Sequence, residues 1–173
     1  CNAMAATVAA SQIGISLQQA CQALSEFVGI KRRMEPIYNE QELTIYDDFA
    51  HHPTAIKTTL DGLRAKVGDA QILAVVEPRS ATMKLGLHQQ VLASAVEAAD
   101  KVFWYQNAII DWDLSQVAEQ TPSTATVSKN IGTLIAQVEK TIVDNKSASK
   151  VTHVVIMSNG GFEGFHVRLV DRF

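Results

Sequence analysis

The hydrophobic pattern divides the chain into two parts. In the first part, small and apolar residues recur with helical spacing over residues 2–13 and again over residues 17–27, which predicts two helices. Ser16 precedes the second of these with Gln19 three residues later, a spacing typical of a capping box. The polar residues 29–36 then form a connector, which we interpret as a hinge or domain boundary.

The second part alternates strand and helix patterns. Strands are predicted at residues 34–38, 43–46, 71–76, 101–105 and 151–157, and helices at 53–66, 87–98, 131–143 and 163–171. The stretch around Trp112 shows no clear pattern and is expected to be irregular. The alternation predicts an α/β fold: a Rossmann-like, doubly wound, mostly parallel sheet, preceded by a short N-terminal helical pair. The predicted boundaries are 1–30 for the helical pair and 31–173 for the α/β domain.

Composition excludes several classes of protein. The chain has 173 residues, of which 47% are hydrophobic and 19% charged, with a net charge of -3. No basic stripe interleaved with aromatic residues is present, so nucleic acid is not an expected partner. No apolar run approaches the ~20 residues that span a bilayer, so no membrane partner is expected either. The two cysteines make neither a disulfide framework nor a metal-ligand spacing, in keeping with a reducing compartment.

Polar residues gather where three of the predicted strands end: Asp48 to His52, Glu77 to Lys84, and Ser158 to Gly161. Because parallel strands end along one edge of a sheet, these three segments are expected to line one crevice. Arg79 and Lys84 suit a carboxylate or phosphate. Two interpretations stay open for these segments: a binding site, or a solvated loop with surface ion pairs and a tight turn that glycine permits.

The histidines do not predict a metal site. His51 and His52 are adjacent and therefore point apart in regular structure, and no third ligand stands at a characteristic spacing. The alternative for this segment is that the neighbouring aspartates favour a helix start and both histidines lie at the surface. The other three histidines, His88, His153 and His166, are isolated, and we expect them to be structural.

Known nucleotide and nucleophile motifs are absent from the sequence. It contains no Gly-x-x-x-x-Gly-Lys-Ser/Thr loop, no Gly-x-Gly-x-x-Gly after a strand and no Gly-x-Ser-x-Gly turn. The expected α/β fold therefore does not by itself indicate a dehydrogenase.

The string Asp48-Phe49-Ala50-His51-His52-Pro53-Thr54, preceded by Lys31-Arg32-Arg33-Met34-Glu35, resembles the C-terminal domain of the Mur ligases. These are the ATP-dependent amide-bond ligases of bacterial peptidoglycan synthesis. Residues 77–86 and 157–162 resemble, within the family, the members that attach a recycled tripeptide. Residues 2–6 are similar to the helix that ends the family's central domain. The resemblance thus covers essentially the whole chain and implies that residues 1–30 come from the end of that domain.

The resemblance implies a reaction. ATP phosphorylates the lactyl carboxylate of UDP-N-acetylmuramate, and the amine of L-Ala-γ-D-Glu-meso-diaminopimelate attacks the acyl phosphate. ATP and Mg²⁺ would be held mainly by the central domain, which makes the chain inactive alone and a piece of a longer, cytoplasmic enzyme. Its partners would be the tripeptide, UDP-N-acetylmuramate and its own N-terminal and central domains.

The resemblance also implies roles for particular residues, with no metal ligand among them. His51 would be catalytic, beside the nucleotide and the amine, and Arg33 and Asp48 would reach the nucleotide. Nine residues would bind the tripeptide: His52, Arg79, Ser80, Thr82, Lys84, Ser158, Asn159, Gly160 and Gly161. Two other functions stay open: the C-terminal domain of the UDP-N-acetylmuramate–L-alanine ligase, and a non-catalytic α/β binding module.

Overall fold

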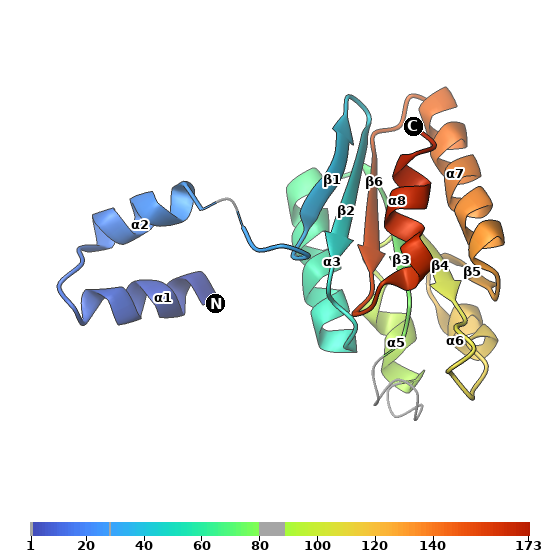
Figure 1. The fold of residues 1–173 in the computed structure, drawn as a ribbon, viewed down its shortest axis with the longest axis horizontal. Helices are drawn as coiled ribbons and strands as arrows, with labels where there is room; N and C mark the ends of the chain where they lie inside the picture. The colour runs from blue at the N-terminus through green and yellow to red at the C-terminus, as the bar shows by residue number, and fades with distance from the viewer. Residues whose placement is uncertain (1, 28, 80–88) are drawn as a thin grey trace. The chain divides into compact units, whose positions relative to one another are not determined.

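The computed structural model describes residues 2–27, 29–79 and 89–173, and the chain divides into two compact units, Cys1–Ile30 and Lys31–Phe173. The first unit contains helices α1 (Asn2–Ser11) and α2 (Leu17–Ser25) (Figure 1). Ser16 and Gln19 form the capping box that the sequence predicts. Each helix ends two residues before its predicted end. Among the described residues of this unit only Ala20 is buried.

The second unit is built on a six-stranded sheet with the strand order β1-β2-β6-β3-β4-β5. Its strands are β1 (Glu35–Glu40), β2 (Leu43–Asp48), β3 (Gln71–Val76), β4 (Lys101–Tyr105), β5 (Thr124–Ser128) and β6 (Thr152–Met157). The hairpin strand β1 is antiparallel to β2, and every other neighbouring pair is parallel. The predicted doubly wound, mostly parallel α/β sheet is therefore confirmed.

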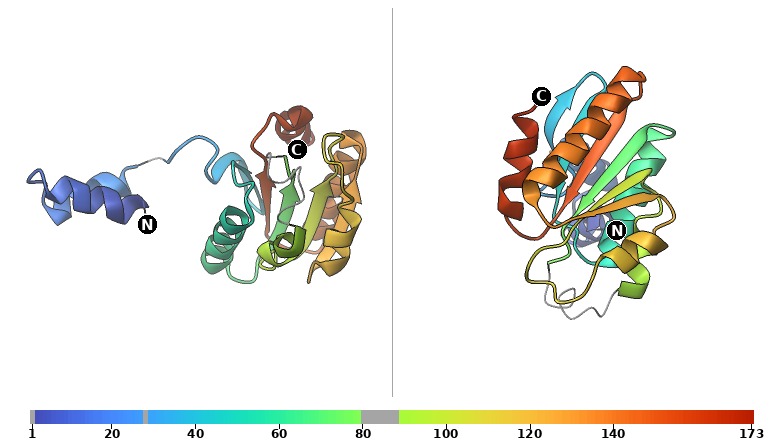
Figure 2. Two further views of the ribbon diagram at one scale, coloured as in Figure 1. Left: turned by 90° about the horizontal axis from the view of Figure 1, so that it is seen from below. Right: turned by 90° about the vertical axis from the view of Figure 1, so that its right-hand side faces the viewer.

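Helices cover both faces of this sheet (Figure 2). One layer consists of α3 (Pro53–Val67), α5 (Gln89–Ala95) and α6 (Ser115–Gln120), and the other of α7 (Ile131–Ser147) and α8 (Phe165–Val170). Along β3, Ala74 packs in the core under the first layer, whereas Leu73 and Val75 pack under the second. A strand covered on both faces must be apolar throughout, which explains the continuous hydrophobic run of β3.

The stretch expected to be irregular contains two elements, α6 and β5. Strand β5 has the sequence Thr-Ala-Thr-Val-Ser and lies at the edge of the sheet, where it pairs only with β4. An edge strand needs little apolar character, because only part of its surface is covered. The expectation of irregular structure was therefore wrong, and for β5 the reason is its position at the edge of the sheet.

Several boundaries also differ from prediction. Strand β2 continues to Asp48, so both aspartates of the segment belong to the strand and not to the loop after it. Helix α7 continues to Ser147. The last helix begins at Phe165, because a 3-10 turn (η1, Phe162–Gly164) precedes it, in which Phe162 and Glu163 have positive φ angles of 47° and 49°.

Candidate functional site

The described parts of the three polar segments, Asp48–His52, Glu77–Arg79 and Ser158–Gly161, lie at the carboxyl edge of the sheet, the lower edge in Figure 1. Strands β2, β6 and β3 are neighbours, and Met157 pairs with both Asp48 and Val76, so the three strands end level with one another. The chain leaves β3 toward α5 on one face and leaves β6 toward α8 on the other. Ligands of open α/β sheets bind at such a reversal.

A buried carboxylate lies at the centre of this edge. Glu77 follows β3 directly and is fully buried. One of its oxygens accepts a hydrogen bond of 2.5 Å from Ser158 Oγ, and the other accepts one of 2.9 Å from Asn107 Nδ2. A carboxylate withdrawn from water is tolerated only when its oxygens are satisfied in this way. Glu77 therefore fixes the ends of β3, β4 and β6 relative to one another.

The turn after β6 is held from two sides. Ser158 N donates to Asp48 O (3.2 Å), and Gly160 N donates to Ser158 Oγ (3.0 Å). Arg79 lies against Gly160 so closely that a Cβ on Gly160 would be 2.5 Å from the Arg79 Nη1 atom. A Cβ on Gly160 would therefore force the Arg79 side chain to move, although the backbone conformation of Gly160 does not itself call for glycine. Asn159 Oδ1 is buried and has no hydrogen-bond partner among the described residues.

Arg79 contributes a partly exposed positive charge to this edge. Its side chain is 42% exposed, and its Nη1 atom lies 4.0 Å from Glu77 Oε1. This loose ion pair leaves most of the guanidinium available to an anion. Ser80, Thr82 and Lys84, which the sequence also assigns to the tripeptide site, lie outside the described residues.

The adjacent histidines have separate environments. His51 Nδ1 is 2.9 Å from Phe49 O, and its ring meets the ring of Phe49 edge to face. His52 is the N-cap of α3, where its Nδ1 accepts a hydrogen bond from Thr54 N. A groove between α3 and α5, lined by His52, Thr54 and Lys57 among others, runs alongside.

The two residues expected at the nucleotide differ in exposure. Asp48 is 2% exposed, and its carboxylate oxygens accept hydrogen bonds from Met34 N (2.8 Å) and Ala50 N (2.7 Å). Any ribose hydroxyl would have to share these oxygens with backbone donors. Arg33 is exposed, with its guanidinium 5.9 Å from the centroid of the Phe49 ring, so it is accessible to a phosphate.

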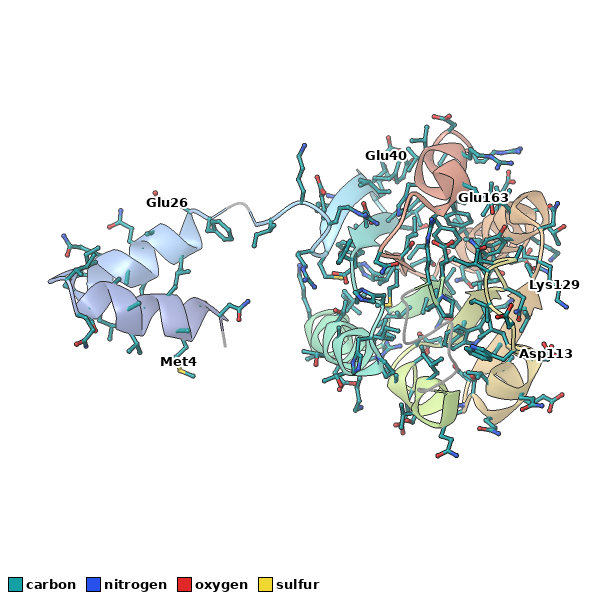
Figure 3. The ribbon with its side chains drawn as sticks, turned by 60° about the horizontal axis from the view of Figure 1, so that its bottom comes forward. Met4, Glu26, Glu40, Asp113, Lys129 and Glu163 are labelled. Atoms are coloured by element: carbon teal, nitrogen blue, oxygen red, sulfur yellow. The ribbon has the colours of Figure 1, made fainter. Side chains whose placement is uncertain are left out.

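Sequence reasoning missed a second acidic group at this edge. Tyr105, at the end of β4, donates a hydrogen bond to Glu163, which is labelled in Figure 3. Burial, followed by the bond to Glu163 and the charge of Glu77, raises the pKa of Tyr105 to about 12. Glu163 was missed because its position depends on a left-handed backbone conformation, which cannot be seen in a single sequence. The position of Glu77 could have been predicted, because a charged residue that directly follows an apolar strand lies at the end of that strand, at the edge of the sheet.

His166, expected to be isolated and structural, belongs to the same region. Its Nε2 atom lies 3.1 Å from Asp47 Oδ1. Burial lowers the pKa of His166, an effect that the charge of Asp47 opposes and that of Arg32 reinforces. Arg32 was also missed as a site residue. Its Nη2 atom donates to the carbonyl oxygens of Ser158 and Gly160.

Comparison with known proteins identifies the family. The profile described as "Mur ligase, glutamate ligase domain" matches residues 32–160, more than half of the chain. The chain belongs to the Mur ligase family. The resemblance predicted from the sequence is therefore confirmed, and the carboxyl edge described above is that of a Mur ligase C-terminal domain.

Two curated Mur ligases match nearly the whole chain. Both are named UDP-N-acetylmuramate–L-alanyl-γ-D-glutamyl-meso-2,6-diaminoheptandioate ligase. The Escherichia coli protein is 44% identical over 98% of this chain and 36% of its own length, and the Haemophilus influenzae protein is 41% identical over 99% and 37%. This chain thus spans little more than a third of these relatives.

Solved structures agree with the family assignment. A murein peptide ligase from Psychrobacter arcticus has a TM-score of 0.72 and 43% identity, covering 98% of this chain and 35% of that one. A domain of a tripeptide ligase from Haemophilus ducreyi has a TM-score of 0.65 and 38% identity, covering 81% of this chain and 98% of that one.

Proposed function

We propose that this chain is the C-terminal domain of an ATP-dependent ligase that joins the recycled tripeptide L-Ala-γ-D-Glu-meso-diaminopimelate to UDP-N-acetylmuramate through an acyl phosphate. The two relatives named as ligases of the tripeptide match 98–99% of this chain. The relatives named UDP-N-acetylmuramate–L-alanine ligase that we compared match at most 59% of it. The difference in coverage favours the tripeptide as the amine substrate.

The observation that carries the proposal is the joint position of Arg79 and the Ser158–Gly161 turn at the carboxyl edge of the sheet. The tripeptide bears three carboxylates and two amines. Arg79 is half-exposed with one distant counter-ion, so its guanidinium suits a carboxylate in bidentate geometry. Of the Ser158–Gly161 turn, Asn159 adds an amide side chain, and Asn159 and Gly161 add backbone N–H groups, whereas the N–H groups of Ser158 and Gly160 already donate within the protein.

The acidic residues of the same edge complement the amines of the substrate. Glu163 lies near Glu77, close enough that both raise the pKa of Tyr105. An ammonium group near these carboxylates would be stabilised by their charge. We assign Ser80, Thr82, Lys84 and His52 to the tripeptide site as well, on the resemblance to the family alone.

The nucleotide side of the proposal rests on Arg33 and His51. Arg33 is exposed beside Phe49, where it can offset phosphate charge, and the ring of His51 meets the same phenyl ring edge to face. Asp48 would act chiefly by fixing Met34 and Ala50, and so the segments that carry Arg33 and His51. No cluster of three His, Cys, Asp or Glu residues suited to a metal occurs in the described ranges; on the resemblance to the family, we assign Mg²⁺ mainly to the central domain.

In the reaction, this domain positions the amine and excludes water. ATP supplies the activation of the UDP-N-acetylmuramate carboxylate. The residues of the carboxyl edge would hold the tripeptide so that its L-alanyl amine faces the activated carbonyl carbon. Orientation of this kind and fixed charge account for most of the acceleration expected of such a site.

Residues 1–30 are proposed to belong to the end of the central ligase domain. Eight large hydrophobic residues of this helical pair and its connector are exposed: Met4, Val8, Ile13, Ile15, Leu17, Leu24, Phe27 and Ile30. So many exposed large hydrophobic residues in one short segment suit burial against a partner, and the enzyme's own preceding domain is the one we propose.

The cytoplasm remains the proposed location, since the ligase would act on UDP-linked precursors and ATP. Within the described parts of the chain, no helix has the length and hydrophobicity to cross a bilayer.

The proposal is tested with the full-length enzyme, UDP-N-acetylmuramate, ATP and Mg²⁺. Phosphate release and product mass would be measured with the tripeptide and, separately, with L-alanine. We expect ligation of the tripeptide with a kcat/KM at least about 100-fold above that for L-alanine. A preference for L-alanine would contradict the proposal and support the alternative ligase. Product with neither amine would support the non-catalytic binding module.

A further inference from the structure

The guanidinium of Arg32 connects two strand ends. Its Nε atom lies 3.1 Å from Asp47 Oδ2 on β2, and its Nη2 atom donates hydrogen bonds to Ser158 O (2.6 Å) and Gly160 O (3.1 Å) after β6. The guanidinium carbon lies 5.2 Å from the centroid of the Phe49 ring. One side chain therefore links β2, the loop after it and the turn after β6.

The backbone of Arg32 is fixed as firmly as its side chain. Arg32 N donates to Glu35 Oε2 (2.8 Å), and Arg32 O accepts from Phe49 N (2.8 Å). Its φ angle is 57°, in the left-handed region that few residues other than glycine adopt. Residues kept in such a conformation by their surroundings are concentrated at functional sites.

Two arginines hold the Ser158–Gly161 turn between them. Arg32 binds the carbonyl groups of Ser158 and Gly160, while Arg79 lies against the Cα of Gly160. The position of the turn relative to Arg79 therefore depends on Arg32. Loss of the Arg32 hydrogen bonds would free two carbonyl groups and let the turn move away from Arg79.

We propose that Arg32 is a positioning residue that fixes the Ser158–Gly161 turn against Arg79 and so sets the affinity for the amine substrate. Its effect on substrate rests on the proposed function, whereas its effect on the turn does not. Arg32 contacts the turn, and its proposed effect on the substrate acts through the turn. It is also the second residue of the unit Lys31–Phe173, so it ties the start of this unit to the substrate turn.

The chain offers a matched control in Arg64. The side chains of Arg32 and Arg64 are 30% and 29% exposed, and each pairs with an aspartate. Arg64 binds the carbonyl groups of Gly68, Ala70 and Ala98 before β3 and β4, at the amino edge of the sheet. Arg64→Ala thus removes a comparable network away from the site.

Kinetics of the full-length enzyme give the first readout. We expect Arg32→Ala to raise the KM for the tripeptide about 10-fold or more while the KM for ATP changes less than about twofold. Arg32→Lys keeps the charge beside Asp47 but cannot present a planar fork to three acceptors, so its KM should be intermediate. Arg64→Ala should lower the melting temperature and leave both KM values near wild type.

Hydrogen exchange gives a readout that is independent of the substrate. In the full-length enzyme with Arg32→Ala, the amides of the Ser158–Phe162 segment should exchange about 10-fold faster than in wild type. They should also exchange faster than in wild type in Arg32→Lys, whereas Arg64→Ala should exchange like wild type. Unchanged exchange there would overturn the positioning role, whatever the substrate proves to be. Faster exchange with equal changes in both KM values would overturn the link to the amine substrate. If Arg32→Ala does not fold, Arg32→Lys decides both points.

Discussion

The hydroxyl of Ser158 donates a hydrogen bond to the fully buried carboxylate of Glu77, although the two residues are 81 positions apart in the chain. The bond joins the turn after β6 to the residue that follows β3, at the point where the two strands send the chain to opposite faces of the sheet. The two segments that carry the candidate substrate residues Arg79 and Gly160 are therefore joined by this bond.

Replacing Ser158 by alanine should destabilise the domain and weaken substrate binding together. The change leaves an oxygen of a buried carboxylate without its donor, which costs roughly 1–3 kcal/mol. The free energy of unfolding in urea would be measured for the 173-residue chain, and the KM for the tripeptide for the full-length enzyme. Ser94→Ala serves as the control, because the hydroxyl of exposed Ser94 donates to Val91 O, in its own helix. Equal stability losses in the two variants would contradict the role given to the Glu77–Ser158 bond.

Gly160→Ala should displace Arg79. The new Cβ would lie 2.5 Å from Arg79 Nη1, so the guanidinium must move, and we expect the KM for the tripeptide to rise about 10-fold. Gly62→Ala is the comparison, since a Cβ on Gly62 meets no atom within 4 Å and alanine stabilises a helix interior by up to about 1 kcal/mol. A Gly160→Ala enzyme with unchanged tripeptide kinetics would show that the contact between Arg79 and Gly160 is not part of the site.

The Tyr105–Glu163 pair predicts a loss of stability at high pH. The pKa of Tyr105 is about 12 in the folded chain, against 10.0 for a free tyrosine. Between these values the unfolded chain loses a proton that the folded chain keeps, so the stability contributed by Tyr105 is complete below pH 10 and falls as the pH rises toward 12. Denaturation at pH 9, 10 and 11 would measure this slope. Tyr105→Phe should reduce it, and an identical slope in the variant would refute the raised pKa.

The sequence predicted the parts of the fold that depend on burial or local chemistry. Strand β3 was predicted with its observed limits because both of its faces are covered and every position after Gln71 is apolar and buried. The capping box at Ser16 depends on residues three positions apart, which a sequence displays directly. Strand β5 was missed because an edge strand has neither a continuous apolar run nor a local capping motif.

For the site, the sequence predicted only which residues lie at the ends of the parallel strands. Parallel strands bring Asp48, Glu77 and Ser158 to one edge, and this follows from topology. The role of Arg32 depends on a left-handed φ angle and on carbonyl groups more than 120 residues away, neither of which leaves a pattern in the sequence. Arg33, the neighbour assigned to the nucleotide from the resemblance, remains a prediction.

The most direct test of the account is the kinetic effect of Arg79→Ala in the full-length enzyme, with Arg172→Ala as the control. Both arginines are exposed and have a glutamate near 4 Å, but Arg172 lines a groove at the other edge of the sheet, beside Leu43 and Thr152. We expect Arg79→Ala to raise the KM for the tripeptide at least about 10-fold and to leave the KM for ATP within about twofold, while Arg172→Ala changes neither. Equal increases in both KM values for Arg79→Ala, or no increase in either, would contradict the assignment of the carboxyl edge to the tripeptide.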